Sequence, residues 1–269
     1  MIRLAAFDLD QTLIGNDLQI SPGVQRAIQQ AQAVGTIVTI VTGRNTFVTE
    51  QFARQLGLHA PIVCMQGGMV YDFLQAQTLY EIRLPEDLLP IIVHSAQRLG
   101  WNLHFEASSC VYMPRHSNHP KILYELLRVS DWVELDDMLN DLPEIPHKFI
   151  VTLNQPDKGE RLLRVSEMKS IFDGRLHIVP SHPYLIEGVP VEVDKGRGLA
   201  WLADYLGIPV EQVMAVGDND NDVPMIRWAG VGVAVGNASP DAKAAADWIA
   251  PRLEEDAAAA AIQRYILNP

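Results

Sequence analysis

Residues 36–42 read TIVTIVT, a run that is β-branched at every position. Such a run predicts a strand covered on both faces, because a strand with one wet face alternates apolar and polar residues. Helix-like segments flank it. Ser21 and Pro22 have the residue types of an N-cap and a first helical position, Gly35 ends the apolar periodicity, and a second helix is expected over 46–56. A buried strand between helices is the repeating unit of a parallel α/β sheet.

The same alternation occurs at both ends of the chain. Further strands are expected at 2–7 and 61–65 in the first part, and the pattern resumes after residue 189. The segments expected there are a helix at 196–206, a strand at 212–217, a helix at 222–228, a strand at 230–235 and helices at 240–246 and 255–267. We therefore expect an α/β fold with a doubly wound, mostly parallel sheet, built from residues 1–83 and 189–269.

Residues 84–188 have a different pattern, and we expect them to form an inserted α/β domain. Strands are expected at 101–107, 110–113, 148–153 and 175–179, and helices near 88–99, 118–128 and 157–170. Histidines are enriched in this part, but scattered surface and partly buried imidazoles explain them most simply.

Charge and composition exclude several classes of function. The chain has 33 acidic and 21 basic residues, for a formal net charge of −12, so it is poorly suited to bind a nucleic-acid backbone. Its two cysteines, Cys64 and Cys110, are too few for a disulfide framework and fit a reducing compartment. The apolar stretch at the N-terminus is too short for a signal peptide, and the uncharged run 27–43 contains glutamines that exclude a membrane span. A cytoplasmic protein with no membrane contact and no obligate protein partner is expected.

Polar side chains gather where the expected strands end. Asp8 and Asp10 follow the first strand, and Thr42 lies at the end of the second. The acidic run GDNDNDVPM (217–225) follows a later strand, and Lys195 opens a helix. Ligands of open α/β sheets bind beyond the carboxyl ends of the strands. Clustered Asp and Asn oxygens there favour a hard cation, and a lysine at a helix start favours an anion.

These residues also carry a resemblance to a known family. The chain resembles the haloacid dehalogenase-like phosphatases, specifically their Cof-type subfamily with a large α/β cap, along its whole length. The matching motifs, in chain order, are DLDQTL (8–13), VTGR (41–44), VDKG (193–196), GDNDNDVPMI (217–226) and GVAVGNASPDAKAAAD (232–247).

The resemblance implies a Mg²⁺-dependent phosphatase for a small phosphorylated metabolite. It implies that Asp8 is the nucleophile that becomes an aspartyl-phosphate and that Asp10 is the general acid and base. The phosphate-binding residues would be Thr42, Gly43, Arg44, Lys195 and Asn221. The Mg²⁺ ligands would be Asp8, Asp10, Asp218, Asn221 and Asp222. The insert 84–188 would be the cap that determines substrate specificity, with His104, Arg115, His116 and Lys148 as candidates to face the cleft.

Three positions depart from the family pattern. Gln11 stands where the family most often has Gly, and we expect the change to be tolerated because the position need not adopt a positive φ. Gln66 stands where Asn is usual, which puts a phosphate contact from this site in doubt. Glu192 stands where relatives often have Gly, and its carboxylate is expected either near Lys195 or in solvent.

Two other functions remain open from the sequence. A phosphomutase would use the same core chemistry and return the phosphoryl group to its substrate. A non-catalytic signalling or binding protein would use only a phospho-accepting aspartate, but such a domain needs neither an inserted cap nor a general acid. Within the leading interpretation, sugar phosphates, phosphorylated cofactors and nucleotide intermediates are all candidate substrates.

Overall fold

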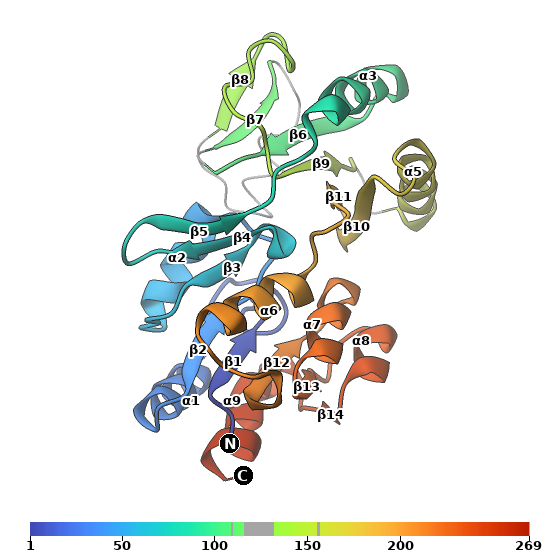
Figure 1. Cartoon of the computed structure of the whole chain (residues 1–269). Helices are drawn as coiled ribbons and strands as arrows, with labels where there is room; N and C mark the ends of the chain where they lie inside the picture. The colour runs from blue at the N-terminus through green and yellow to red at the C-terminus, as the bar shows by residue number, and fades with distance from the viewer. Residues whose placement is uncertain (109, 116–131, 155–156, 269) are drawn as a thin grey trace. The chain divides into compact units, whose positions relative to one another are not determined.

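The structure is a computed structural model that describes residues 1–108, 110–115, 132–154 and 157–268 (Figure 1). The chain divides into two compact units. The first unit comprises Met1–Gly43, Thr49–Tyr80 and Asp194–Pro269, and the second comprises Arg44–Val48 and Glu81–Val193. The helix expected at 118–128, and His116, lie outside the described residues. No helix in the described part of the chain is long and apolar enough to cross a membrane.

A five-stranded parallel sheet forms the centre of the first unit. Its order is β14-β13-β12-β1-β2, and every neighbouring pair runs parallel. The strands are β1 (Leu4–Phe7), β2 (Ile37–Ile40), β12 (Val213–Gly217), β13 (Val231–Ala234) and β14 (Trp248–Ile249). The predicted doubly wound parallel sheet is confirmed.

Helices cover both faces of this sheet, as successive residues of β1 show. Ala5 and Phe7 pack into one apolar cluster with residues of α1 and α9, whereas Leu4 and Ala6 pack into another with residues of α6. The helices are α1 (Pro22–Ala33), α2 (Thr46–Gln55), α6 (Lys195–Tyr205), α7 (Val223–Trp228), α8 (Pro240–Ala245) and α9 (Ala257–Ile262). The π-helical turn η6 (Gln263–Leu267) completes the segment predicted as the closing helix.

The predicted start of α1 is confirmed in detail. The Ser21 hydroxyl accepts a hydrogen bond from the Val24 N–H at 3.1 Å, and Pro22 occupies the first turn, where its missing N–H has no intrahelical partner to lose. Gly35 follows the helix with a φ of 91°. Ser21 therefore satisfies one of the N–H groups that a helix start leaves without a partner.

A small three-stranded sheet, β3-β4-β5, continues the first unit beyond β2. Its strands are β3 (Ile62–Cys64), β4 (Met69–Asp72) and β5 (Gln77–Glu81), and a parallel bridge between Val41 and Val63 links β3 to the end of β2. β3 and β4 run antiparallel and are joined by the 3₁₀ turn η1 (Met65–Gly67). The chain therefore reverses its direction through this turn.

The second unit has its own sheet and its own core. In the described residues its six-stranded sheet has the order β10-β11-β9-β6-β7-β8. The strands are β6 (Asn102–Glu106), β7 (Val111–Pro114), β8 (Trp132–Leu135), β9 (Lys148–Thr152), β10 (Leu176–His182) and β11 (Leu185–Pro190), and the described helices are α3 (Leu89–Leu99) and α5 (Lys158–Ile171). β8 and β11 were not predicted, whereas the other four strands coincide with predicted segments.

The two faces of this second sheet differ in chemistry. Phe105 and Phe149 lie in an apolar cluster that includes residues of α3 and α5. Their neighbours Glu106 and Lys148 point the other way, since successive side chains of a strand alternate between faces. Lys148 Nζ is 3.1 Å from Glu106 and 2.7 Å from Glu187, and all three side chains are buried. One face of the sheet is therefore an apolar core and the other carries a buried charge cluster.

Candidate active site

The site begins where two adjacent strands end. β1 and β12 pair in parallel with Phe7 opposite Val216, so the residues that follow them lie side by side. These residues are Asp8 and Asp218, and the Asp8 N–H donates to the Val216 carbonyl at 2.9 Å. Parallel pairing thus brings together two carboxyl groups that are far apart in the sequence.

Lys195 joins this pair from the start of α6. Its Nζ lies 2.5 Å from Asp8 Oδ1 and 2.5 Å from Asp222 Oδ1, and all three side chains are at least 95% buried. Asp194 caps α6 by accepting from the Arg197 N–H at 2.8 Å. A cation at a helix N-terminus opposes the helix dipole, so the position of Lys195 depends on the two carboxylates that it bridges.

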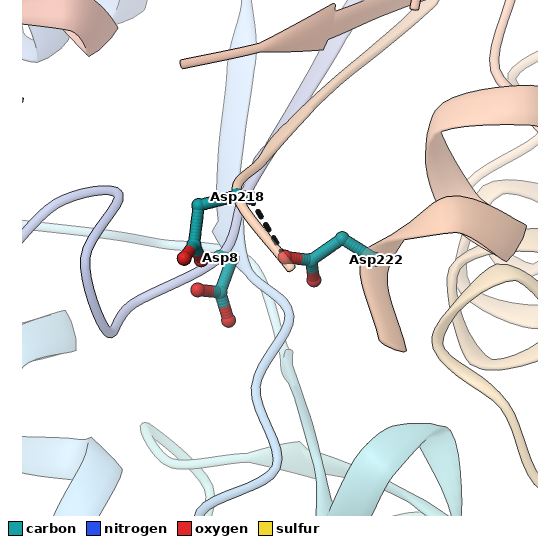
Figure 2. Close-up of side chains that lie close together, drawn as sticks. All are labelled: Asp8, Asp218 and Asp222. Carbon is teal, nitrogen blue, oxygen red and sulfur yellow. Dashed lines mark hydrogen bonds between the residues drawn. The ribbon is translucent and has the colours of Figure 1, made fainter. Parts of the chain in front are cut away.

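The loop after β12 fixes Asp222 in place. Asp222 Oδ2 accepts from the N–H groups of Asp218 at 2.9 Å and Asn219 at 3.0 Å. A Cβ at Gly217 would lie 2.5 Å from the Asp222 Cβ, so only glycine allows this approach. Both oxygens of Asp222 therefore accept hydrogen bonds, Oδ2 from two backbone N–H groups and Oδ1 from Lys195. Figure 2 shows the backbone bond from Asp218.

The three carboxylates form a candidate cation site. One oxygen from each of Asp8, Asp218 and Asp222 lies within 4.8 Å of the others (Figure 2). Three carboxylates and one ammonium carry a formal charge of −2, and oxygen ligands of this kind suit Mg²⁺. The donor set and its charge thus fit one divalent cation.

The pKa values express the same crowding of negative charge. Burial, followed by repulsion from Asp8 and Asp222, raises the pKa of Asp218 to about 9. Burial, followed by Asp222, raises the pKa of Asp8 to about 7, although the Lys195 ammonium opposes the shift. Burial alone would lower the pKa of Lys195, but Asp222 and Asp8 outweigh it and raise that pKa. The raised pKa values of Asp8 and Asp218 thus have the same causes, burial and repulsion between neighbouring carboxylates.

The remaining predicted residues occupy different places. Asp10 is close enough to Asp8 for its charge to raise the Asp8 pKa. Thr42 is buried, and its N–H donates to the Val63 carbonyl at 2.9 Å, which holds the loop after β2 against β3. Gly43 is the last residue of its segment in the first unit. Arg44 belongs to the second unit, where burial raises the pKa of Glu106 and the Arg44 charge offsets a small part of that rise.

Asn221 is hydrogen-bonded to Gln66, the residue that stands where the family usually has Asn. Its Nδ2 donates to Gln66 Oε1 at 2.9 Å, across 155 residues of chain. Gln66 is buried and adopts a φ of 61°. Its side-chain oxygen thus contacts the Asn221 amide.

The other two departures are also resolved. Gln11 has a φ of 60°, so the expectation that this position need not adopt a positive φ is wrong. The loop imposes the conformation, because the Gln11 N–H donates to the Ile14 carbonyl at 2.7 Å and the Gln11 carbonyl accepts from Asn237 Nδ2 at 2.9 Å. Glu192 is exposed, which agrees with the second of its two expected positions.

Two hydroxyl residues that the sequence analysis did not single out support the acidic loop. Thr12 Oγ1 lies 3.4 Å from Asp218 Oδ1. The Ser239 N–H donates to the Asp218 carbonyl at 2.7 Å, and its hydroxyl donates to Asp220 Oδ1 at 2.6 Å while capping α8. The Ser239-Pro240 pair repeats the Ser21-Pro22 signature of a helix start, and this signal could have identified Ser239 as a cap.

A parallel α/β sheet with an aspartate pair at its strand ends and a buried lysine between carboxylates defines a class of hydrolase. The family description "haloacid dehalogenase-like hydrolase" matches residues 5–262. The chain therefore belongs to the haloacid dehalogenase-like hydrolases, and the predicted family is confirmed.

Relatives of known name cover nearly the whole chain. A 5-amino-6-(5-phospho-D-ribitylamino)uracil phosphatase of Bacillus subtilis, YcsE, is 30% identical over 99% of this chain and 96% of its own length. An HMP-PP phosphatase of Serratia proteamaculans is 28% identical over 100% of this chain and 97% of its own length. A crystal structure of a haloacid dehalogenase-like hydrolase from Bacteroides thetaiotaomicron superimposes with a TM-score of 0.87 and 28% identity, covering 98% of this chain and 99% of that one.

Proposed function

We propose that this protein is a Mg²⁺-dependent phosphatase that hydrolyses a small phosphorylated metabolite through an aspartyl-phosphate. The observation that carries the proposal is the buried Lys195 ammonium, 2.5 Å from both Asp8 and Asp222 and next to Asp218. A buried lysine between two carboxylates can hold one aspartate in the orientation that a nucleophile needs. Its positive charge also attracts a phosphate. The phosphatase names of the relatives support the same reaction.

Each of these side chains has a separate role in the reaction. Asp8 attacks phosphorus, the bond from phosphorus to the leaving oxygen breaks, and Asp10 gives that oxygen a proton. Asp10 then takes a proton from water as the water attacks phosphorus, which releases phosphate and regenerates Asp8. Lys195 orients Asp8 and balances the phosphoryl charge, and Thr42 and Gly43 supply hydrogen bonds to the phosphoryl oxygens.

Asp8, Asp218 and the Asp10 carbonyl would hold Mg²⁺, with Asn221 and Asp222 completing the surroundings. When bound, Mg²⁺ supplies charge neutralisation that lets a phosphate approach three carboxylates. Asp222 contributes mainly as an anchor, because its oxygens already accept from Lys195 and from two backbone N–H groups.

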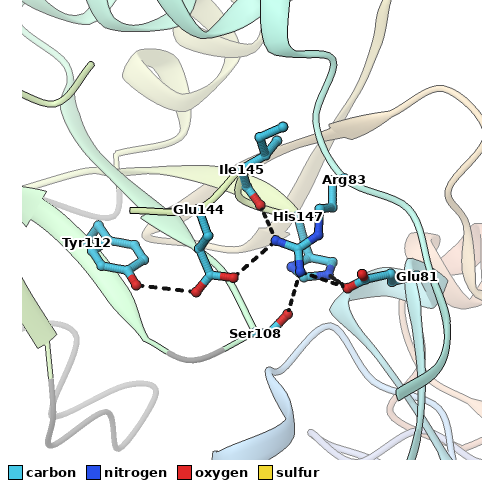
Figure 3. A network of polar contacts seen from close by, with 7 residues as sticks. All are labelled: Glu81, Arg83, Ser108, Tyr112, Glu144, Ile145 and His147. Atoms are coloured by element: carbon cyan, nitrogen blue, oxygen red, sulfur yellow. Dashed lines mark hydrogen bonds and ion pairs between the residues drawn. The ribbon is translucent and has the colours of Figure 1, made fainter. Parts of the chain in front are cut away.

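The second unit is proposed as the cap that selects the leaving group. Its separate sheet and core support a role as an independent unit. Within this unit Arg83 donates to the Ile145 carbonyl at 2.6 Å and to Glu144 at 3.0 Å (Figure 3). The named relatives act on a phosphorylated ribitylaminouracil and on HMP-PP, so small phosphorylated metabolites of this size are the proposed substrates.

The test is phosphate release from a panel of phosphorylated metabolites and p-nitrophenyl phosphate, with Mg²⁺ or with chelator. Wild-type protein should release phosphate only with Mg²⁺. Asp8→Asn should lower kcat at least about 10³-fold, because an amide is a poor nucleophile. Asp17→Asn, a change of the same kind at an exposed loop position, should leave kcat unaltered. Full activity in excess chelator, or in Asp8→Asn, would contradict the proposal.

A further inference from the structure

The turn η1 has an unusual backbone for the residues that it contains. Met65, Gln66 and Gly67 have φ values of 53°, 61° and 96°. Residues with side chains rarely adopt a positive φ, and two in succession persist only where their surroundings hold them. An observed strain of this kind points to a local role for the turn.

The turn is wedged between two parts of the candidate active site. The Gln66 N–H donates to the Thr42 carbonyl at 3.1 Å, and a Cβ at Gly43 would lie 2.3 Å from Gln66 Nε2. On the other side, a Cβ at Gly67 would lie 2.1 Å from the Asp194 carbonyl oxygen, immediately before Lys195. These close approaches fix the Gln66 side chain, which is only 2% exposed.

The fixed carboxamide of Gln66 determines how Asn221 is oriented. Gln66 Oε1 accepts from Asn221 Nδ2 at 2.9 Å. The Asn221 carboxamide is planar, with its NH₂ group and its carbonyl oxygen on opposite sides. Because the NH₂ group donates to Gln66, the Asn221 carbonyl oxygen points away from Gln66. Asn221 Oδ1 is buried and has no hydrogen-bond partner among the described residues. A buried acceptor without a donor is costly, so this oxygen needs a cation or a bound water.

Asn221 lies in the turn η4 (Asp220–Asp222), directly before Asp222 and three residues after Asp218. We propose that Gln66 is a positioning residue for the Mg²⁺ site, which holds the Asn221 amide so that Oδ1 is presented to the cation or to a water bound to it. Gln66 itself contacts neither cation nor substrate in this role. The inference rests on the proposed function, because it assumes that Mg²⁺ binds at Asp8 and Asp218, beside Asp222.

Mg²⁺ binding to the full chain without substrate, measured by calorimetry, tests the proposal. Gln66→Met keeps the length of the side chain and removes the acceptor, and it should raise the Kd for Mg²⁺ about tenfold, as loss of a partner of a metal ligand does. Gln66→Glu keeps an acceptor for Asn221 and should bind Mg²⁺ no more weakly than wild type. Gln25→Met is the matched control, because it removes the hydrogen bond that the Gln25 side chain in α1 donates to the Ile20 carbonyl before the helix, and it should leave the Kd unaltered.

A double-mutant cycle separates positioning from a general structural effect. In an Asn221→Ala background, Gln66→Met should cause no further loss of Mg²⁺ affinity, because the oxygen that Gln66 positions is gone. A wild-type Kd in Gln66→Met, or a loss of the same size in both backgrounds, would overturn the inference. Should Gln66→Met not fold, Asn221→Ala alone must raise the Kd about tenfold or more, and an unaltered Kd there overturns it as well.

Failure of the proposed function gives a different result. If wild-type protein binds no Mg²⁺, the cation site itself is wrong, and the role of Gln66 is wrong with it. If wild-type protein binds Mg²⁺ and the Gln66 variants bind it equally well, only the positioning role is refuted.

Discussion

Replacing Lys195 with Met should destabilise the first unit strongly. The Nζ is 2.5 Å from Asp8 and from Asp222, and the side chain is 2% exposed. Methionine has a similar length and no charge, so the variant leaves two buried carboxylates without their cation. Removing one partner of a buried ion pair costs about 3–5 kcal/mol, out of a total stability of about 5–15 kcal/mol.

The size of the loss should depend on pH. Burial already raises the pKa of Asp8 to about 7. Without the ammonium this carboxyl takes up a proton more readily, and the neutral form is not repelled by Asp222. We therefore expect a smaller loss near pH 6, where Asp8 is largely protonated, and a loss that increases as the pH rises above about 7.

Urea denaturation in chelator, followed by tryptophan fluorescence, measures the effect. Lys243→Met is the matched control, since the same substitution at a half-buried position in α8 should cost about 1 kcal/mol or less. Adding Asp222→Asn to Lys195→Met should restore part of the lost stability, because one of the two stranded charges is removed. A wild-type urea midpoint for Lys195→Met, or no recovery in the double variant, would refute this account of the site.

Three further predictions concern single residues. Burial lowers the pKa of His147, so the neutral imidazole contributes its full stabilisation above about pH 6.5. The free energy of unfolding should fall as the pH decreases below this value. In urea titrations, His147→Gln should remove this dependence on pH. Gly67→Ala should cost about 2–4 kcal/mol in thermal unfolding, because its Cβ meets backbone at 2.1 Å, whereas Gly35→Ala, with a similar φ of 91° and open space, should cost only about 1 kcal/mol. Ser239→Ala should cost about 1 kcal/mol through loss of the α8 cap, and an unaltered melting temperature would contradict it.

The fold was predictable where periodicity and caps report local structure. The β-branched run at 36–42 gave β2, and Ser21 gave the start of α1. β11 was missed because it contains Glu187, a buried charge that is stable only beside Lys148 on a neighbouring strand. β14 has two residues, too few for any periodicity.

The candidate site was predictable where it follows strand ends. Asp8, Asp218, Asp222 and Lys195 meet as the parallel sheet and the family motifs implied, and their chemical roles stay predictions. The bond between Gln66 and Asn221 could not be foreseen, because it joins two loops through their side chains across 155 residues. The φ of Gln11 was predicted wrongly because a backbone bond inside the loop, not the residue type, sets it.

The position of β1 in its sheet has a consequence for how the chain folds during synthesis. Leu4 pairs with Ile37 on one side and with Val213 on the other. The second pairing closes a loop that contains the whole second unit, and long loops cost entropy before their contacts form. The second unit can therefore fold before β12 has been synthesised. The first unit then gains its central strand and the partners of Asp8 in a single late step.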